Sequence, residues 1–174
     1  MAMNKSSFAV IVEDEAWKNK LGNVENQADV VLQASLFFLQ ENDLGFDGWN
    51  NKPVFIGLSL SNNDNVQKLN FEFRGKDKPT NVLSFANIDD ENFEDEFLAN
   101  EIVELGDIIM AIETLEDEAN IKNISLKDHF SHLLVHGILH LFGYDHQNDD
   151  DADEMESIEI DILKSLGIAN PYEE

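Results

Sequence analysis

Histidine is the residue type whose placement in this chain first suggests chemistry. All five histidines of the 174-residue sequence lie between positions 129 and 146. His136 and His140 are four positions apart in a stretch with helical periodicity, so both imidazoles project from one face of the expected helix. Gly143 can adopt a positive φ and end that helix, which lets the chain turn back and bring His146 to the same point. This arrangement predicts a metal site with three imidazole ligands and an open position.

Zinc is the expected ion, with other divalent transition metals as alternatives. The chain has no cysteine, so such a metal must be held by His, Asp or Glu. Zinc suits three neutral imidazoles and lowers the pKa of a bound water to about 7. The spacing H-x-x-x-H-x-x-G-x-x-H equals that of the metzincin peptidases, except that Gly137 stands where they keep a catalytic glutamate. The pattern therefore predicts a zinc-dependent hydrolase without the peptidase base.

Apolar periodicity predicts the elements that would hold this site. Strands are expected over residues 8–12, 54–60, 82–85 and 105–112, and helices over residues 26–41, 113–120, 126–142 and 150–166. A further helix, capped by Ser61, Asn62 or Asp64, is expected to end at Arg74. Strands that alternate with helices indicate an α/β (α+β) fold. We expect a single compact domain over residues 1–174, with a roughly four-stranded mixed sheet packed by helices and a zincin-like helix carrying the histidines.

Two further segments complete this scheme. In the helix before Arg74, Val66, Leu69 and Phe73 fall at spacings that predict a buried stripe. The acid-rich residues 89–104 are interpreted as a surface insertion.

The remaining histidines and the net charge of the chain further limit the functions to consider. His132 and His129 are interpreted as packed or solvated histidines, with a supporting role behind the metal ligands as the alternative. The formal net charge is -25, from 36 acidic and 11 basic residues, which repels nucleic acid and anionic membranes at long range. The apolar run Phe8–Val12 is too short for a signal peptide or a membrane span. We therefore expect a cytoplasmic protein with no membrane or DNA partner.

Three sequence blocks resemble those of a known family. HGILHLFGYDH at positions 136–146, RGKDKPTNVLSF at 74–85 and LGDI at 105–108 resemble the YbeY family of bacterial ribosomal-RNA maturation endoribonucleases. The resemblance runs from about Leu69 to Gly167. It implies zinc on the three histidines and a single-strand-specific endoribonuclease that acts in 16S rRNA 3′-end maturation and in ribosome quality control. It also implies ribosomal RNA, the small ribosomal subunit and assembly proteins as partners.

The resemblance maps the family's active-site arginine onto Arg74. A guanidinium can hold a phosphate bidentately and stabilise the charge of a phosphorane-like transition state. Lys76 and Lys78 make this segment a local positive island for substrate binding. His136 belongs to the catalytic set through the water that its metal activates. Asp145 is the nearest acid that could take a proton, but it can equally orient His146 or cap the turn.

Other interpretations stay open at this stage. Attack by water and attack by the ribose 2′-hydroxyl are both compatible with these residues. One alternative function is a non-catalytic ribosome-assembly factor with structural zinc, and another is a metallopeptidase-like hydrolase, against which Gly137 counts. Because so acidic a chain attracts RNA weakly, we expect a protein partner to recruit it to the ribosome.

Overall fold

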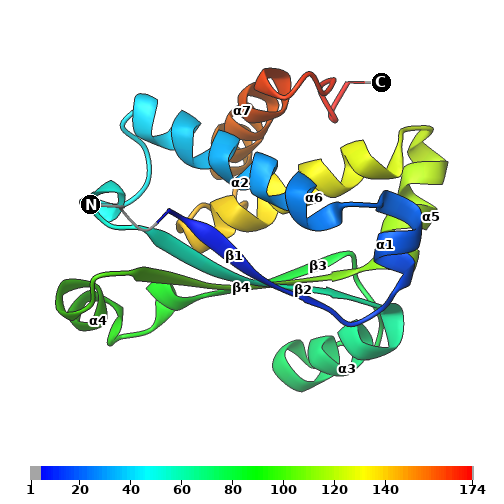
Figure 1. Ribbon diagram of the computed structural model, residues 1–174, viewed down its shortest axis with the longest axis horizontal. Coiled ribbons are helices and arrows are strands. Elements are labelled where there is room, and N and C mark those ends of the chain that lie inside the picture. The colour runs from blue at the N-terminus through cyan, green and yellow to red at the C-terminus, as the bar shows by residue number, and fades with distance from the viewer. Residues whose placement is uncertain (1–4, 174) are drawn as a thin grey trace.

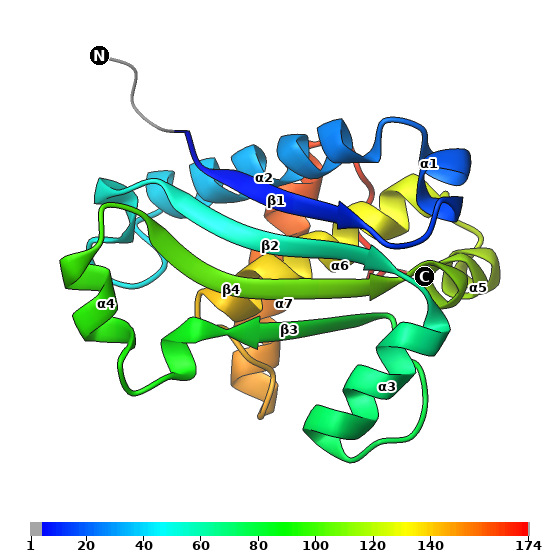
Figure 2. The ribbon, with the colours of Figure 1, turned by 60° about the horizontal axis from the view of Figure 1, so that its bottom comes forward.

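A four-stranded mixed sheet is the frame of the molecule in the computed structural model, which describes residues 5–173. The strands are β1 (Ser7–Val12), β2 (Val54–Ser61), β3 (Val82–Ala86) and β4 (Val103–Ala111). Their order is β1-β2-β4-β3 (Figure 2). β1, β2 and β4 run parallel, and β3 pairs antiparallel with β4 at one edge. The predicted mixed sheet is confirmed.

Helices cover the two faces of the sheet unequally. The described residues form α1 (Ala16–Leu21), α2 (Val24–Glu41), α3 (Asn63–Arg74), α4 (Phe93–Ala99), α5 (Ile112–Lys122), α6 (Leu126–Leu141) and α7 (Asp149–Ser165), with short 3-10 helices at Trp49–Asn51 and Asn87–Asp89. Figure 1 shows α2, α6 and α7 stacked over one face, whereas α3 lies on the opposite side. No helix in residues 5–173 is long and apolar enough to cross a membrane.

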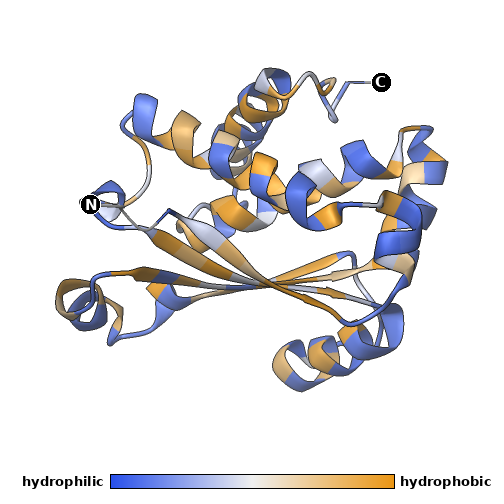
Figure 3. Ribbon diagram, in the orientation of Figure 1, coloured by the Kyte–Doolittle hydropathy of each residue, from blue (hydrophilic) through white to orange (hydrophobic). Residues whose placement is uncertain are grey.

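The central helix α6 is enclosed by its neighbours. It contacts α2, α5, α7 and the strands β3 and β4. Phe130, Leu134 and Ile138 are fully buried, as the period of the sequence predicted. Figure 3 shows the apolar residues gathered where the helices meet the sheet. A helix that is apolar on most sides must be enclosed in this way, and α6 therefore holds its histidines on a rigid support.

A smaller, separate apolar cluster supports α3 on the other face of the sheet. Val66 from α3, Leu83 from β3 and Ala111 from β4 are its buried members. The expected buried stripe of α3 is wrong at one position, because Phe73 is 61% exposed, although its ring forms a T-shaped pair with that of Phe85. The last turn of α3 therefore extends past the small cluster into solvent.

Asn70 takes the buried position in that part of α3. Its side-chain amide donates a hydrogen bond of 2.8 Å to the main-chain carbonyl of Lys78, and its own carbonyl accepts one from the amide of Lys76. The turn after α3 is thus held by a buried polar side chain, which an apolar-periodicity argument does not register.

The sequence did not predict α1. Asp14 caps its first turn by accepting a hydrogen bond from the amide of Ala16 at 2.9 Å. Trp17 anchors it, because the indole is fully buried and its N–H donates to the carbonyl of Ser61 at 2.8 Å. One tertiary anchor holds a helix that is too short to show periodicity.

The acid-rich segment is also more ordered than predicted. Residues 93–99 form α4, and residues 103–104 already belong to β4. Phe93 and Phe97, one turn apart in α4, pack with their ring edges against Phe46. Residues 89–104 were interpreted as a surface insertion, and α4, which has no buried residue, lies at the surface as an ordered helix.

Candidate metal centre and its cavity

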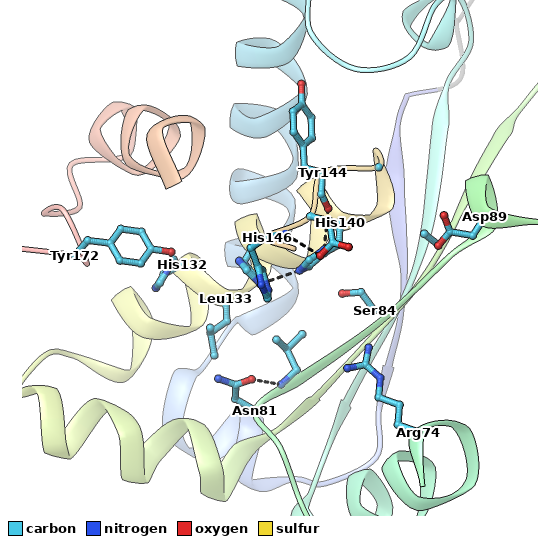
Figure 4. Close-up of a pocket in the computed structure, with 15 residues that line it drawn as sticks. Arg74, Asn81, Ser84, Asp89, His132, Leu133, His140, Tyr144, His146 and Tyr172 are labelled. Carbon is cyan, nitrogen blue, oxygen red and sulfur yellow. Dashed lines mark hydrogen bonds between the residues drawn. The ribbon is translucent and has the colours of Figure 1, made fainter. Parts of the chain in front are cut away.

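The three predicted ligands lie together at the end of α6. His136, His140 and His146 offer nitrogen atoms that all lie within 4.8 Å of one another. The first two project from successive turns of α6, and their ring centroids are 4.5 Å apart. Gly143 has a φ of 96°, so the chain leaves the helix through a left-handed turn and returns His146 to the pair (Figure 4). The turn has the conformation that the sequence predicted.

Hydrogen bonds behind the rings turn two imidazoles toward a common point. His140 donates from Nδ1 to the carbonyl of Tyr144 at 2.9 Å. His136 directs Nδ1 to a carboxylate oxygen of Glu159 at 3.2 Å. With both protons on Nδ1, the two Nε2 atoms carry lone pairs, and these atoms are 2.9 Å apart. Two acceptors this close repel each other unless a cation is shared between them.

The donor set fits a zinc ion. Zinc–nitrogen bonds of about 2.0–2.1 Å in tetrahedral geometry separate the ligand atoms by roughly 3.3 Å, close to the spacing of the two Nε2 atoms. Burial lowers the pKa of His140, and the proximity of His136 lowers it further. His140 is therefore neutral at pH 7, as a metal ligand must be.

Glu159 is a buried carboxylate behind the ligands. It is 0% exposed and accepts hydrogen bonds from His132 Nε2 at 2.9 Å and from the Tyr172 hydroxyl at 2.9 Å, besides that from His136. Burial acts to raise its pKa, but the hydrogen bonds from His132 and His136 outweigh it and bring the pKa to about 2. The buried His132 thus contacts the carboxylate that holds a predicted metal ligand, which matches the alternative of a supporting role behind the ligands.

A second group of hydrogen-bonded polar side chains reaches the same region from α5. Glu118 accepts hydrogen bonds from His129 Nε2 at 2.9 Å and from the Asn81 side-chain amide at 3.0 Å. His129 is 1% exposed, which agrees with a packed histidine. Asn81 in turn accepts a hydrogen bond from the amide of Val82, at the start of β3. Sequence reasoning assigned no role to Glu118 or Asn81.

Gly137 lies in close contact with the sheet, at the position where the peptidases keep a glutamate. A Cβ atom at this position would lie 3.1 Å from Cδ1 and 3.3 Å from Cγ2 of Ile108, and 3.3 Å from Oγ of Ser84. α6 therefore packs against β4 and β3 at a distance that suits glycine. A larger side chain here would require these neighbours to shift.

The histidines and Arg74 line one cavity of about 630 Å³. Arg74 reaches it from the end of α3, on the other side of β3 from α6 (Figure 4). Asn81 and Ser84, which the sequence analysis did not single out, also line it. The exposed residues Lys76 and Lys78 are not among its lining residues. The structure thus brings Arg74 to the histidines and leaves the two lysines outside.

Asp145 also lines the cavity, at the turn before His146. Its carboxylate accepts a hydrogen bond from the main-chain amide of His146 at 2.8 Å. This hydrogen bond is the main reason that the pKa of Asp145 is lowered, and burial acts in the opposite direction. The contact matches the turn-capping alternative.

Comparison with known proteins agrees with this architecture. The model of the family described as Endoribonuclease YbeY matches residues 12–167. The chain belongs to the YbeY family. A protein named Endoribonuclease YbeY from Francisella tularensis subsp. novicida is 48% identical over 117 residues, which cover 67% of this chain and 70% of the relative. Another of that name, from Paramagnetospirillum magneticum, is 50% identical over 121 residues, covering 70% and 73%.

A solved structure shares the fold of this chain. The solution structure of a protein from Thermotoga maritima matches with a TM-score of 0.54 at 19% identity and covers 96% of this chain and 99% of that one. At this identity the likeness concerns the fold alone. The histidines, Arg74 and Glu159 lie inside the range matched by the YbeY family, whereas Tyr172 lies beyond it.

Proposed function

We propose that this protein is a zinc-dependent endoribonuclease that cleaves single-stranded RNA during 3′-end maturation of 16S ribosomal RNA and in ribosome quality control. The observation that carries the proposal is the shared cavity, in which an arginine faces three convergent imidazoles. Relatives with about 50% sequence identity are named endoribonucleases, which supports RNA as the substrate. Ribosomal RNA, the small subunit and its assembly proteins are the proposed partners, and the cytoplasm is the proposed location.

His136, His140 and His146 would hold the zinc ion. Bound there, zinc would polarise a phosphate oxygen and lower the pKa of a nearby water. The protein's contribution is to keep the imidazoles neutral and aimed at one point, through the Tyr144 carbonyl and the Glu159 carboxylate. Asp145 fixes the turn that presents His146, and its lowered pKa makes it a weak base.

Arg74 is the proposed phosphate-binding residue. Its guanidinium can donate two parallel hydrogen bonds to phosphate oxygens and stabilise the charge that builds up during displacement at phosphorus. The cavity of about 630 Å³ is in the range that suits a small ligand, such as one or two nucleotides, and is too small for a duplex. This size favours single-stranded RNA.

Lys76 and Lys78 are proposed to hold phosphates outside the cavity. Both are exposed and follow Arg74 in the chain. They offset only a small part of a net charge of -25, so general attraction to RNA is weak. We therefore propose that a protein partner recruits the enzyme to the small subunit.

The test compares ligand and phosphate-site variants on one RNA. His146→Ala is the first variant, because His146 is exposed and its loss leaves the core intact. It should lose zinc and cleavage of a labelled single strand while its circular dichroism is unchanged, and His136→Ala should do the same. Arg74→Lys should keep zinc and lose at least tenfold in cleavage, since lysine cannot bind bidentately. The same RNA annealed to its complement is the specificity control. Undiminished cleavage by folded, zinc-free His146→Ala would disprove the proposal.

A further inference from the structure

The chain beyond α7 returns to the metal centre. Asn170 shapes this return, because its side-chain oxygen accepts a hydrogen bond from the amide of Tyr172 at 2.8 Å. The ring of Tyr172 lies edge-on to His132, with centroids 5.4 Å apart, and lines the cavity (Figure 4). Its hydroxyl contacts both oxygens of Glu159, at 2.9 Å and 3.2 Å. A segment outside the family match is therefore two hydrogen bonds away from His136.

The hydrogen bonds of Glu159 are divided unevenly between its oxygens. Oε1 accepts from His132, His136 and Tyr172. Oε2 has Tyr172 as its single partner within residues 5–173. An ionised carboxylate only accepts hydrogen bonds, so the tyrosine must donate. Burial and the charge of Glu159 raise the pKa of Tyr172, so the hydroxyl keeps the proton that it donates.

The orientation of Glu159 matters for the ligand in front of it. Oε1 receives Nδ1–H of His136, which leaves the Nε2 lone pair directed toward His140. If the carboxylate rotated, His136 would lose the acceptor that fixes both its tautomer and its ring plane. Partners of this kind tune a metal site although they do not touch the ion.

We propose that Tyr172 is a positioning residue of the metal centre: its hydroxyl holds Glu159 in the orientation that directs His136 to the ion. The C-terminal segment is then part of the site rather than an appendage of the fold. The inference rests on the proposed zinc site. It is independent of the substrate, because it concerns metal affinity.

The expected loss of zinc affinity is smaller for residues that lie further from the ion. Loss of a direct partner of a metal ligand typically weakens metal affinity by about 10- to 100-fold, which is the expectation for Glu159→Gln. Tyr172 acts one contact further away, so Tyr172→Phe should raise the zinc Kd by a smaller factor of roughly three to ten. Phenylalanine keeps the ring against His132 and removes only the hydroxyl.

The chain offers a matched control in its other tyrosine, Tyr144. Tyr144→Phe also removes a hydroxyl, which points away from the histidines in Figure 4, and Tyr144 supports His140 through its main-chain carbonyl, which the substitution leaves in place. Zinc Kd would be measured for the full-length proteins by competition with a chromophoric chelator. The absorption spectrum of the cobalt-loaded proteins would report ligand geometry, and thermal unfolding of the metal-free proteins would report the fold.

The expected result is a raised zinc Kd and an altered cobalt spectrum for Tyr172→Phe, with Tyr144→Phe like the wild type. An unchanged Kd for Tyr172→Phe would overturn the inference, and so would a lower melting temperature of the metal-free variant without a change in Kd. The latter would mean that Tyr172 only stabilises the fold. If the wild type itself bound no zinc, the proposed zinc function would fail and the inference with it.

Discussion

Replacing Gly137 by alanine should destabilise the protein, although the same change stabilises most helices. In a helix interior, alanine is favoured over glycine by about 1 kcal/mol. Here the new Cβ would lie 3.1 Å and 3.3 Å from two carbons of Ile108, and 3.3 Å from Ser84 Oγ. Overpacking of a close-packed core costs about 1–3 kcal/mol. The expected net loss is about 1 kcal/mol, or roughly 2–4 °C in melting temperature for a chain of this size.

A double-mutant cycle isolates the steric conflict. Ile108→Val removes Cδ1, the atom nearest to the new methyl group. Alone it should cost about 0.5–1.5 kcal/mol, as such truncations do in cores. Combined with Gly137→Ala it should relieve the conflict. The loss in free energy of unfolding of the double variant should then be about 1 kcal/mol smaller than the sum of the losses of the two single variants. Urea unfolding of the metal-free proteins measures each free energy of unfolding.

The outcome decides why this position is glycine. If the two changes add within about 0.5 kcal/mol, the helix and strand do not conflict at this point and the packing explanation fails. Stabilisation by Gly137→Ala alone would have the same meaning. If the coupling is found, a glutamate placed here would meet the same atoms, so restoring the peptidase motif would disturb α6 rather than supply a base.

Two further predictions concern charge. Glu159 has a pKa of about 2, below its ordinary 4.5, so it stabilises the fold above pH 4.5 and this contribution disappears as the pH falls toward 2. Urea unfolding between pH 2 and 6 should therefore show a steep loss in the wild type and a shallower one in Glu159→Gln; equal slopes would contradict the assignment. Lys76→Ala with Lys78→Ala should make RNA binding less sensitive to salt. The slope of the logarithm of the binding constant against the logarithm of the salt concentration should become shallower by about 0.7 for each phosphate that the lysines no longer neutralise. Fluorescence anisotropy measures this slope. Lys127→Ala with Lys164→Ala, in α6 and α7 rather than in the segment that follows Arg74, should leave it unchanged.

The metal centre was predictable because its geometry is mostly local. The spacing of His136 and His140 fixes their common face once the helix exists, and Gly143 needs only its own φ to return His146. The strands and longer helices followed from period and lie within two residues of their predicted ends. The approach of Arg74 to this site required the pairing of β3 with β4, which periodicity does not predict. The family resemblance alone mapped Arg74 onto the active site.

Other parts of the molecule depend on contacts that the local sequence does not encode. Phe93 and Phe97 order α4 through Phe46, while the acids around them suggest a loop. Glu159 and Tyr172 are 13 positions apart and meet only after α7 has ended. Phe73 was predicted to be buried and is exposed. Its helical period is correct, but a period cannot tell whether the sheet and its apolar cluster extend beneath the last turn of α3.

The unequal support of α3 and α6 has a consequence for motion. α3 lies over a buried cluster of three residues, whereas α6 is enclosed by the main core. A segment held by less buried apolar area opens at a lower free-energy cost, so amide protons of α3 should exchange with solvent more readily than those of α6. Arg74 therefore lies on the more mobile side of the cavity, and the histidines lie on its more rigid side. An RNA strand that contacts both walls would slow exchange in α3 far more than in α6.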